Sequence, residues 1–80
     1  MTLEEQDLEQ SARRHADTLL SDPCAGNQIS ALLYGRESRP RWFATWPYLR
    51  LKGLAQRMYG EWTLTPTGER VKAILKEAQR

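Results

Sequence analysis

Apolar residues near the start of the chain recur at the spacing of one helix face. They are Leu8, Ala12, Ala16, Leu19 and Leu20. Thr2 followed by Glu5 fits a capping box, in which each side chain bonds a backbone N–H near the other, and it marks the start of the helix. Pro23 cannot continue a helical hydrogen-bond ladder. The pattern therefore predicts an amphipathic helix over residues 3–20.

Two shorter helices are predicted next. The first covers residues 28–34, between Asn27, a good N-cap, and Gly35, a natural helix end. A continuous helix beyond it would hold Pro47 in its interior at a cost of about 3 kcal/mol. Thr45 is a better N-cap than Ser38 or Arg39 before Pro40. A helix that begins after Thr45 has Pro47 in its first turn, where proline is tolerated. We therefore expect a loop or single turn at 39–44 and a third helix at 46–52.

A hairpin is predicted where two short runs of alternating character flank Tyr59-Gly60. The runs are residues 54–58 and 62–65, and Gly60 can take the positive φ that a tight turn needs. A two-stranded hairpin cannot bury itself, so it must lean on the helices.

A closing helix is predicted over residues 66–78, with Thr65 as N-cap and Pro66 at its first position. Together these elements predict one domain, residues 1–80, of the α+β class and mostly α: three helices, a short two-stranded hairpin and a C-terminal helix. The expected core consists of Leu33, Leu49, Leu54, Leu64, Val71, Ile74 and Leu75.

Charge divides the chain into unlike parts. The net charge of the whole is only +2. Residues 1–25 carry six acidic and two basic side chains, whereas residues 26–60 carry six basic side chains against Glu37 alone. Such a basic segment favours a polyanionic partner. The alternative is an ordinary solvated basic loop.

Several classes of protein are not expected from the sequence. One cysteine, Cys24, and one histidine, His15, are too few for a structural zinc site or an internal disulfide. The acidic N-terminus lacks a signal-peptide pattern, and no apolar stretch approaches the ~20 residues of a membrane span. No nucleophile motif or glycine-rich phosphate loop is present. We expect a cytoplasmic, non-enzymatic protein without cofactor, metal or membrane partner, and we interpret His15 as a partly buried structural residue.

Two motifs in the C-terminal half resemble a known family. Leu49-x-x-Lys52-Gly53-Leu54 is similar to the end of a recognition helix and the first wing strand, and Trp62-x-Leu64-Thr65-Pro66-x-Gly68 to the second wing strand and closing helix. Over residues 49–75 the chain thus resembles the winged-helix (winged helix-turn-helix) family. It departs from that family in its short wing and in the prolines, Pro40 and Pro47, near the recognition helix.

The resemblance implies which residues would contact a partner. In winged helices the start of the third helix and the loop before it approach the DNA major groove, and the wing contacts the backbone. The candidate binding residues are Arg36, Arg39, Arg41, Thr45, Tyr48, Arg50, Lys52, Arg57 and Tyr59. Each could equally be an exposed residue without function.

Aromatic and apolar side chains suggest two further possibilities. Trp42, Phe43 and Trp46 could stack on an unpaired base or fill a partner's pocket, although we expect at least two of the three in the core. The first helix could form a homodimer or simply cover its own core. The side chains that could cross a two-fold axis are Leu3, Leu8 and Leu19.

Two functions fit these patterns. The first is a small DNA-binding transcriptional regulator of prokaryotic or phage type, which would contact double-stranded DNA through a basic helix and a short wing. The second is a protein-binding adaptor, or a phage-encoded inhibitor of a host nucleic-acid machine, whose basic face would occupy an anionic surface of a host protein. The local basic segment favours the first, and the modest net charge favours the second.

Overall fold

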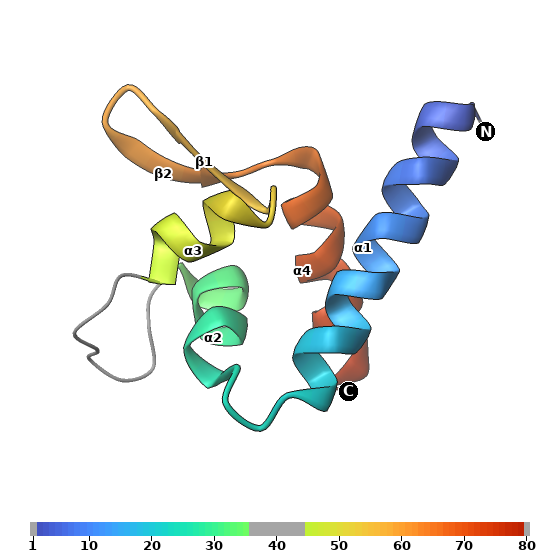
Figure 1. Ribbon diagram of the computed structural model, residues 1–80, viewed down its shortest axis with the longest axis horizontal. Coiled ribbons are helices and arrows are strands. Elements are labelled where there is room, and N and C mark those ends of the chain that lie inside the picture. The colour runs from blue at the N-terminus through green and yellow to red at the C-terminus, as the bar shows by residue number, and fades with distance from the viewer. Residues whose placement is uncertain (1, 36–44, 80) are drawn as a thin grey trace.

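The predicted mostly helical α+β fold is confirmed. The computed structural model describes residues 2–35 and 45–79, which form four helices and one antiparallel hairpin (Figure 1). The order is α1 (Leu3–Ser21), α2 (Gly26–Tyr34), α3 (Thr45–Leu51), β1 (Ala55–Met58), β2 (Glu61–Leu64) and α4 (Pro66–Ala78). Every predicted element is present, with ends displaced by two residues at most.

Threonine side chains begin both long helices, as the sequence predicts. The Thr2 hydroxyl accepts a hydrogen bond from the Glu5 N–H at 3.1 Å, and the Thr65 hydroxyl accepts one from the Gly68 N–H at 3.1 Å. Each bond satisfies a backbone donor that has no partner inside the helix. Pro66 follows Thr65 at the first position of α4.

The expected cap of α2 is wrong. The Asp22 side chain accepts from the Cys24 N–H at 2.8 Å, and the Asp22 carbonyl accepts from the Ala25 N–H at 3.2 Å. This tight turn lets the Ala25 carbonyl receive the first helical bond, from Ile29, at 3.0 Å. The helix therefore starts at Gly26, and Asn27 is a buried helical residue rather than the N-cap.

The core lies where α1 and α2 pack against α4 and where α3 meets β1 (Figure 1). Its largest side chains are Leu19, Leu32, Leu49, Leu54, Val71 and Leu75. Of the predicted core, Leu64 and Ile74 are only partly buried at its edge. Leu20, which was expected on the buried face of α1, is 49% exposed because the face that meets the core runs through Ala12, Ala16 and Leu19 instead.

Two segments distant in sequence cross at Leu54 and Gly68. The Leu54 carbonyl accepts from the Thr65 N–H at 3.1 Å, and the Thr65 hydroxyl donates to the Gly53 carbonyl at 2.6 Å. A Cβ placed on Gly68 would lie 1.9 Å from the Leu54 oxygen, far inside contact distance. The first turn of α4 therefore accepts only glycine at this position, because the opposing atom is backbone and cannot rotate away.

We expect Gly68→Ala to destabilise the protein by about 1–3 kcal/mol, the usual cost of overpacking. In an unobstructed helix the same substitution would add about 1 kcal/mol of stability. The sign of the change in unfolding free energy therefore shows whether the two segments cross this closely. Glu69→Ala is the matched control at the next, exposed position and should stay within about 0.5 kcal/mol of wild type. Urea unfolding measures both. A Gly68→Ala protein more stable than wild type would show that the two segments do not cross this closely.

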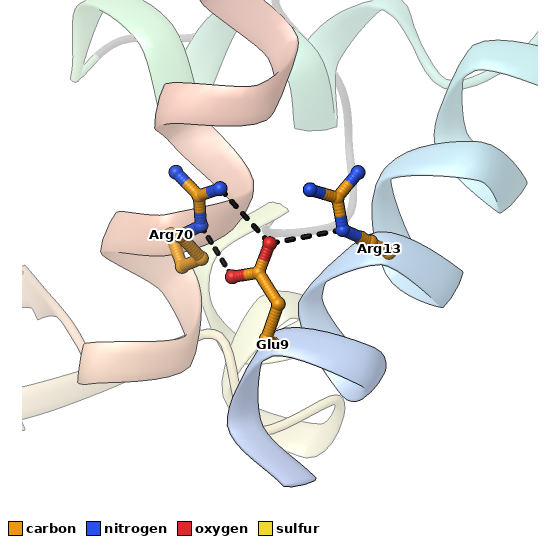
Figure 2. Close-up of polar contacts among 3 residues, drawn as sticks. All are labelled: Glu9, Arg13 and Arg70. Carbon is orange, nitrogen blue, oxygen red and sulfur yellow. Dashed lines mark hydrogen bonds and ion pairs between the residues drawn. The ribbon is translucent and has the colours of Figure 1, made fainter. Parts of the chain in front are cut away.

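An ion-pair cluster joins the outer faces of α1 and α4. Figure 2 shows the Glu9 carboxylate between two guanidinium groups. Arg70 on α4 donates through Nη2 at 2.9 Å and also through Nε, and Arg13 lies one turn further along α1, with its Nε 2.9 Å from Glu9 Oε1. The bidentate hydrogen bond from Arg70, aided by both positive charges, holds the pKa of Glu9 below its ordinary value.

This cluster predicts a pH-dependent contribution to stability. Because the folded-state pKa of Glu9 is lowered, the contribution is present above its unfolded value of about 4.3 and is lost as pH falls through the lower folded value. Glu9→Gln should therefore have a lower urea midpoint than wild type at pH 7, and the difference should shrink toward pH 3. Asp17→Asn, at an exposed position of α1 away from its N-terminus, is the control and should keep a urea midpoint close to that of wild type. A Glu9→Gln deficit that is constant over this range would exclude the ion pair as its cause.

Candidate nucleic-acid interface

α3 presents a mixed outer surface. Thr45 and Leu49 are buried on its inner side, with 2% and 0% of their surface exposed. The side chains exposed on its outer side are Pro47, Tyr48, Arg50 and Leu51. Leu51 is 86% exposed. The outer side of α3 thus combines one cation with apolar surface.

The hairpin is short and ends in a two-residue turn. Met58 pairs with Glu61, so only Tyr59 and Gly60 lie between the strands. Their φ angles are 52° and 81°, and two positive values are what a type I′ turn requires. The left-handed conformation costs a residue with a Cβ about 1–2 kcal/mol, and Tyr59 adopts it with 99% of its surface exposed.

Stacked tryptophans hold the hairpin against α3. Residues Ala55, Arg57, Trp62 and Leu64 share one face of the hairpin, because side chains alternate along strands. Trp62 on this face stacks on Trp46 of α3, with ring centroids 6.0 Å apart and planes 18° apart. The shared face therefore points toward α3, and the stack fixes the angle between hairpin and helix.

Arg57 is the cross-strand partner of Trp62 in the hairpin. Its guanidinium carbon is 5.8 Å from the Trp62 ring centroid, within cation–π range. The side chain is exposed, so the contact orients its charge without removing it from water. Arg57 thus places a cation on the side of the hairpin that faces α3.

Lys52, just after α3, is engaged within the fold. Its ammonium donates to Gln28 Oε1 on α2 at 3.3 Å and lies 4.8 Å from the centre of the Tyr48 ring. Its charge also acts on His15, which is half-buried as predicted. Burial lowers the pKa of His15, and the positive charges of Lys52 and Arg14 lower it further.

The α3–hairpin face, defined here as Tyr48, Arg50, Leu51 and Arg57, carries two arginines that pair with no described carboxylate. No acidic residue occurs between Thr45 and Gly60, and no carboxylate of the described chain forms an ion pair with Arg50 or Arg57. Arg13 and Arg70, on the other side of the molecule, are both paired with Glu9. Arg13 and Arg70 therefore stabilise the fold, whereas Arg50 and Arg57 are available to a binding partner.

The predicted binding residues differ in how far the structure exposes them. Tyr48, Arg50, Arg57 and Tyr59 are exposed on α3 and the hairpin. Thr45 is buried, which removes it from the surface candidates, and Lys52 is half-buried with its ammonium engaged. The remaining calls, Arg36, Arg39 and Arg41, lie outside the described residues, as do Trp42 and Phe43.

Sequence reasoning missed two features of this region. The exposure of Leu51 was not foreseen, although its position next to Arg50 and three residues after Tyr48 places it on the outer side once Leu49 faces inward. The Trp46–Trp62 stack was also missed. Strand alternation gave a signal for it, because it puts Trp62 on the same face as the partly buried Leu64.

The described residues form neither a metal-binding cluster nor a membrane-spanning helix. Within residues 2–35 and 45–79, no three His, Cys, Asp or Glu side chains gather closely enough to hold a metal ion. None of the helices described is both long and apolar enough to cross a bilayer. The chain matches no protein-family model, no curated protein and no solved structure. Any function therefore has to follow from these residues and their geometry.

Removing the tryptophan stack should loosen the hairpin selectively. Trp62→Ala loses partly buried aromatic contact, and stacked pairs contribute about 0.5–1.5 kcal/mol beyond their burial. We expect amide exchange in residues 55–64 to accelerate by roughly tenfold, whereas α1 and α4 keep their protection. Thr63→Ala, on the opposite face of the same strand, should change exchange little. Equal acceleration throughout the chain would mean that the stack supports the whole fold rather than the hairpin.

Proposed function

We propose that this chain is a small cytoplasmic DNA-binding regulator that meets double-stranded DNA with its α3–hairpin face. The observation that carries the proposal is the charge of that face. Arg50 on α3 and Arg57 on the hairpin are both exposed, and neither forms an ion pair with a described carboxylate. Exposed, unpaired arginines can replace the counterions condensed on a phosphate backbone.

The arrangement of the elements supports the same proposal. The major groove of B-DNA admits an α-helix, and the winged-helix resemblance pairs such a helix with a hairpin that reaches the neighbouring backbone. α3 and the hairpin lie side by side here, locked by Trp46 and Trp62 (Figure 1). Arg50 would contact the groove, Arg57 a phosphate, and Tyr59 the backbone at the hairpin tip.

A second candidate function is a protein-binding adaptor or inhibitor. The observation that favours it is the apolar part of the α3–hairpin face, since Leu51 is 86% and Tyr48 43% exposed on the same helix as Arg50. Phosphate contacts do not need such side chains, whereas apolar residues next to an arginine are typical of protein interfaces. Leu51→Ser separates the two functions, because it should leave phosphate-driven DNA binding within about twofold.

Titration of labelled duplex DNA at several salt concentrations tests the proposal. Each phosphate neutralised contributes a slope of about −0.9 to log affinity against log salt, and three to five contacts would give roughly −2.7 to −4.5. Arg57→Ala should weaken binding to all sequences and flatten the slope by about one unit. Arg50→Ala, if this residue reads a base, should cost about 1–3 kcal/mol on a preferred site alone.

The matched control is Arg14→Ala, which removes the same charge from an exposed position on α1. Its salt slope should equal that of wild type. The proposal fails if wild type does not bind duplex at low salt and tens of micromolar protein, or if Arg14→Ala and Arg57→Ala weaken binding equally.

A further inference from the structure

The first turn and a half of α1 projects from the molecule without support. Residues 2–7 are all exposed, and Leu3 has 79% of its surface in solvent. These turns extend past α4 at one end of the longest axis (Figure 1). A helix segment with no tertiary packing is marginal in water, because most helical stability in proteins comes from burying one face. This segment therefore has a face available for a partner.

The same turns carry three acidic side chains that make no ion pair within the described chain. Glu4, Glu5 and Asp7 form no ion pair with any described residue, whereas Glu9, one turn later, is held by Arg13 and Arg70. We call Leu3, Glu4, Glu5 and Asp7 the α1 tip. It presents an exposed leucine among three uncompensated negative charges.

The α3–hairpin face is the complement of the α1 tip. It presents two arginines that pair with no described carboxylate, together with Tyr48 and Leu51, which are exposed on α3. The α1 tip and this face lie toward opposite ends of the molecule, whose longest extent is 40 Å (Figure 1). One chain cannot bring them together, whereas two chains can.

We propose that the α1 tip of one copy docks on the α3–hairpin face of a second copy. The carboxylates of Glu4, Glu5 and Asp7 lie against Arg50 and Arg57, and Leu3 packs on Leu51. The contact is heterologous, because two different surfaces meet. A symmetric α1–α1 pair fits less well, since Leu19 is buried in its own core and the acidic tips would repel each other.

Electrostatics sets the strength and the salt dependence of this contact. Exposed ion pairs contribute about 0–1 kcal/mol each, and one leucine adds little area, so the association is weak. Screening is the decisive variable, because the Debye length is about 30 Å at 0.01 M salt and about 3 Å at 1 M. Association should therefore be measurable at low salt and absent at high salt.

A charge-swap experiment on nucleic-acid-free protein tests the proposal. Glu4→Lys/Glu5→Lys makes both surfaces of one variant basic, and Arg50→Glu/Arg57→Glu makes both surfaces of the other acidic. In sedimentation velocity at about 0.01 M salt, wild type should self-associate. Each variant alone should lose at least about tenfold in apparent association constant, which corresponds to about 1.4 kcal/mol. An equimolar mixture of the two variants should recover association, because each basic surface then meets an acidic one.

Two controls make the outcome specific. Glu69→Lys/Glu77→Lys applies the same change in net charge to exposed positions on α4 and should still self-associate. Circular dichroism should show all variants folded, as expected for exposed positions. The proposal is overturned if wild type stays monomeric at low salt, if the α4 control loses association as fully as the α1 variant, or if the mixture fails to recover it. Failure here leaves DNA binding untouched, because the α1 tip has no part in that proposal.

Discussion

The backbone crossing at Leu54 and Gly68 is the constraint on which the rest of the structure depends. At this point the chain leaving α3, the first residue of the hairpin region and the first turn of α4 share one small volume. Leu54 N–H bonds the Leu49 carbonyl at 3.0 Å, and the Leu54 carbonyl bonds Thr65. Thr65 in turn caps α4 through Gly68 and bonds Gly53. Because backbone atoms and the Thr65 hydroxyl make these contacts, the crossing fixes where β1 starts and where β2 ends, regardless of the exposed side chains.

The position of the candidate site follows from that crossing together with one side-chain contact. The crossing anchors the hairpin at its base, and the Trp46–Trp62 stack fixes it further out against α3. Two points of attachment define an orientation, which a short sheet of two strands could not maintain alone. Arg57 and Tyr59 are thereby carried on a hairpin that is fixed against α3 rather than on a free arm. A pre-ordered arrangement of cations loses less conformational entropy when a polyanion binds.

Local patterns predicted the elements well and the site less well, for physical reasons. Caps, prolines and apolar spacing act within a few residues, so they located α1, α4 and the hairpin turn to within a residue or two. The start of α2 was predicted two residues too late. The Asp22 side chain forms a turn before the helix, so the helix begins at Gly26 and does not need Asn27 as its N-cap. The hydrogen bond of the Lys52 ammonium was not predicted because its partner, Gln28, is far away in sequence. Exposure of a charge depends on such tertiary contacts, and composition does not reveal them.

The polarity of the charges connects the two proposed ligands of the α3–hairpin face. DNA and the α1 tip would both be polyanions on Arg50 and Arg57, and one side chain cannot neutralise both at once. Linkage then requires each ligand to weaken the other by the same factor. Three carboxylates within about one helical turn approach the charge spacing of duplex DNA, about one per 1.7 Å, but they stop there. DNA continues the array and releases condensed counterions on binding, a gain in entropy that a single helical turn cannot match. A duplex should therefore displace the second copy rather than the reverse.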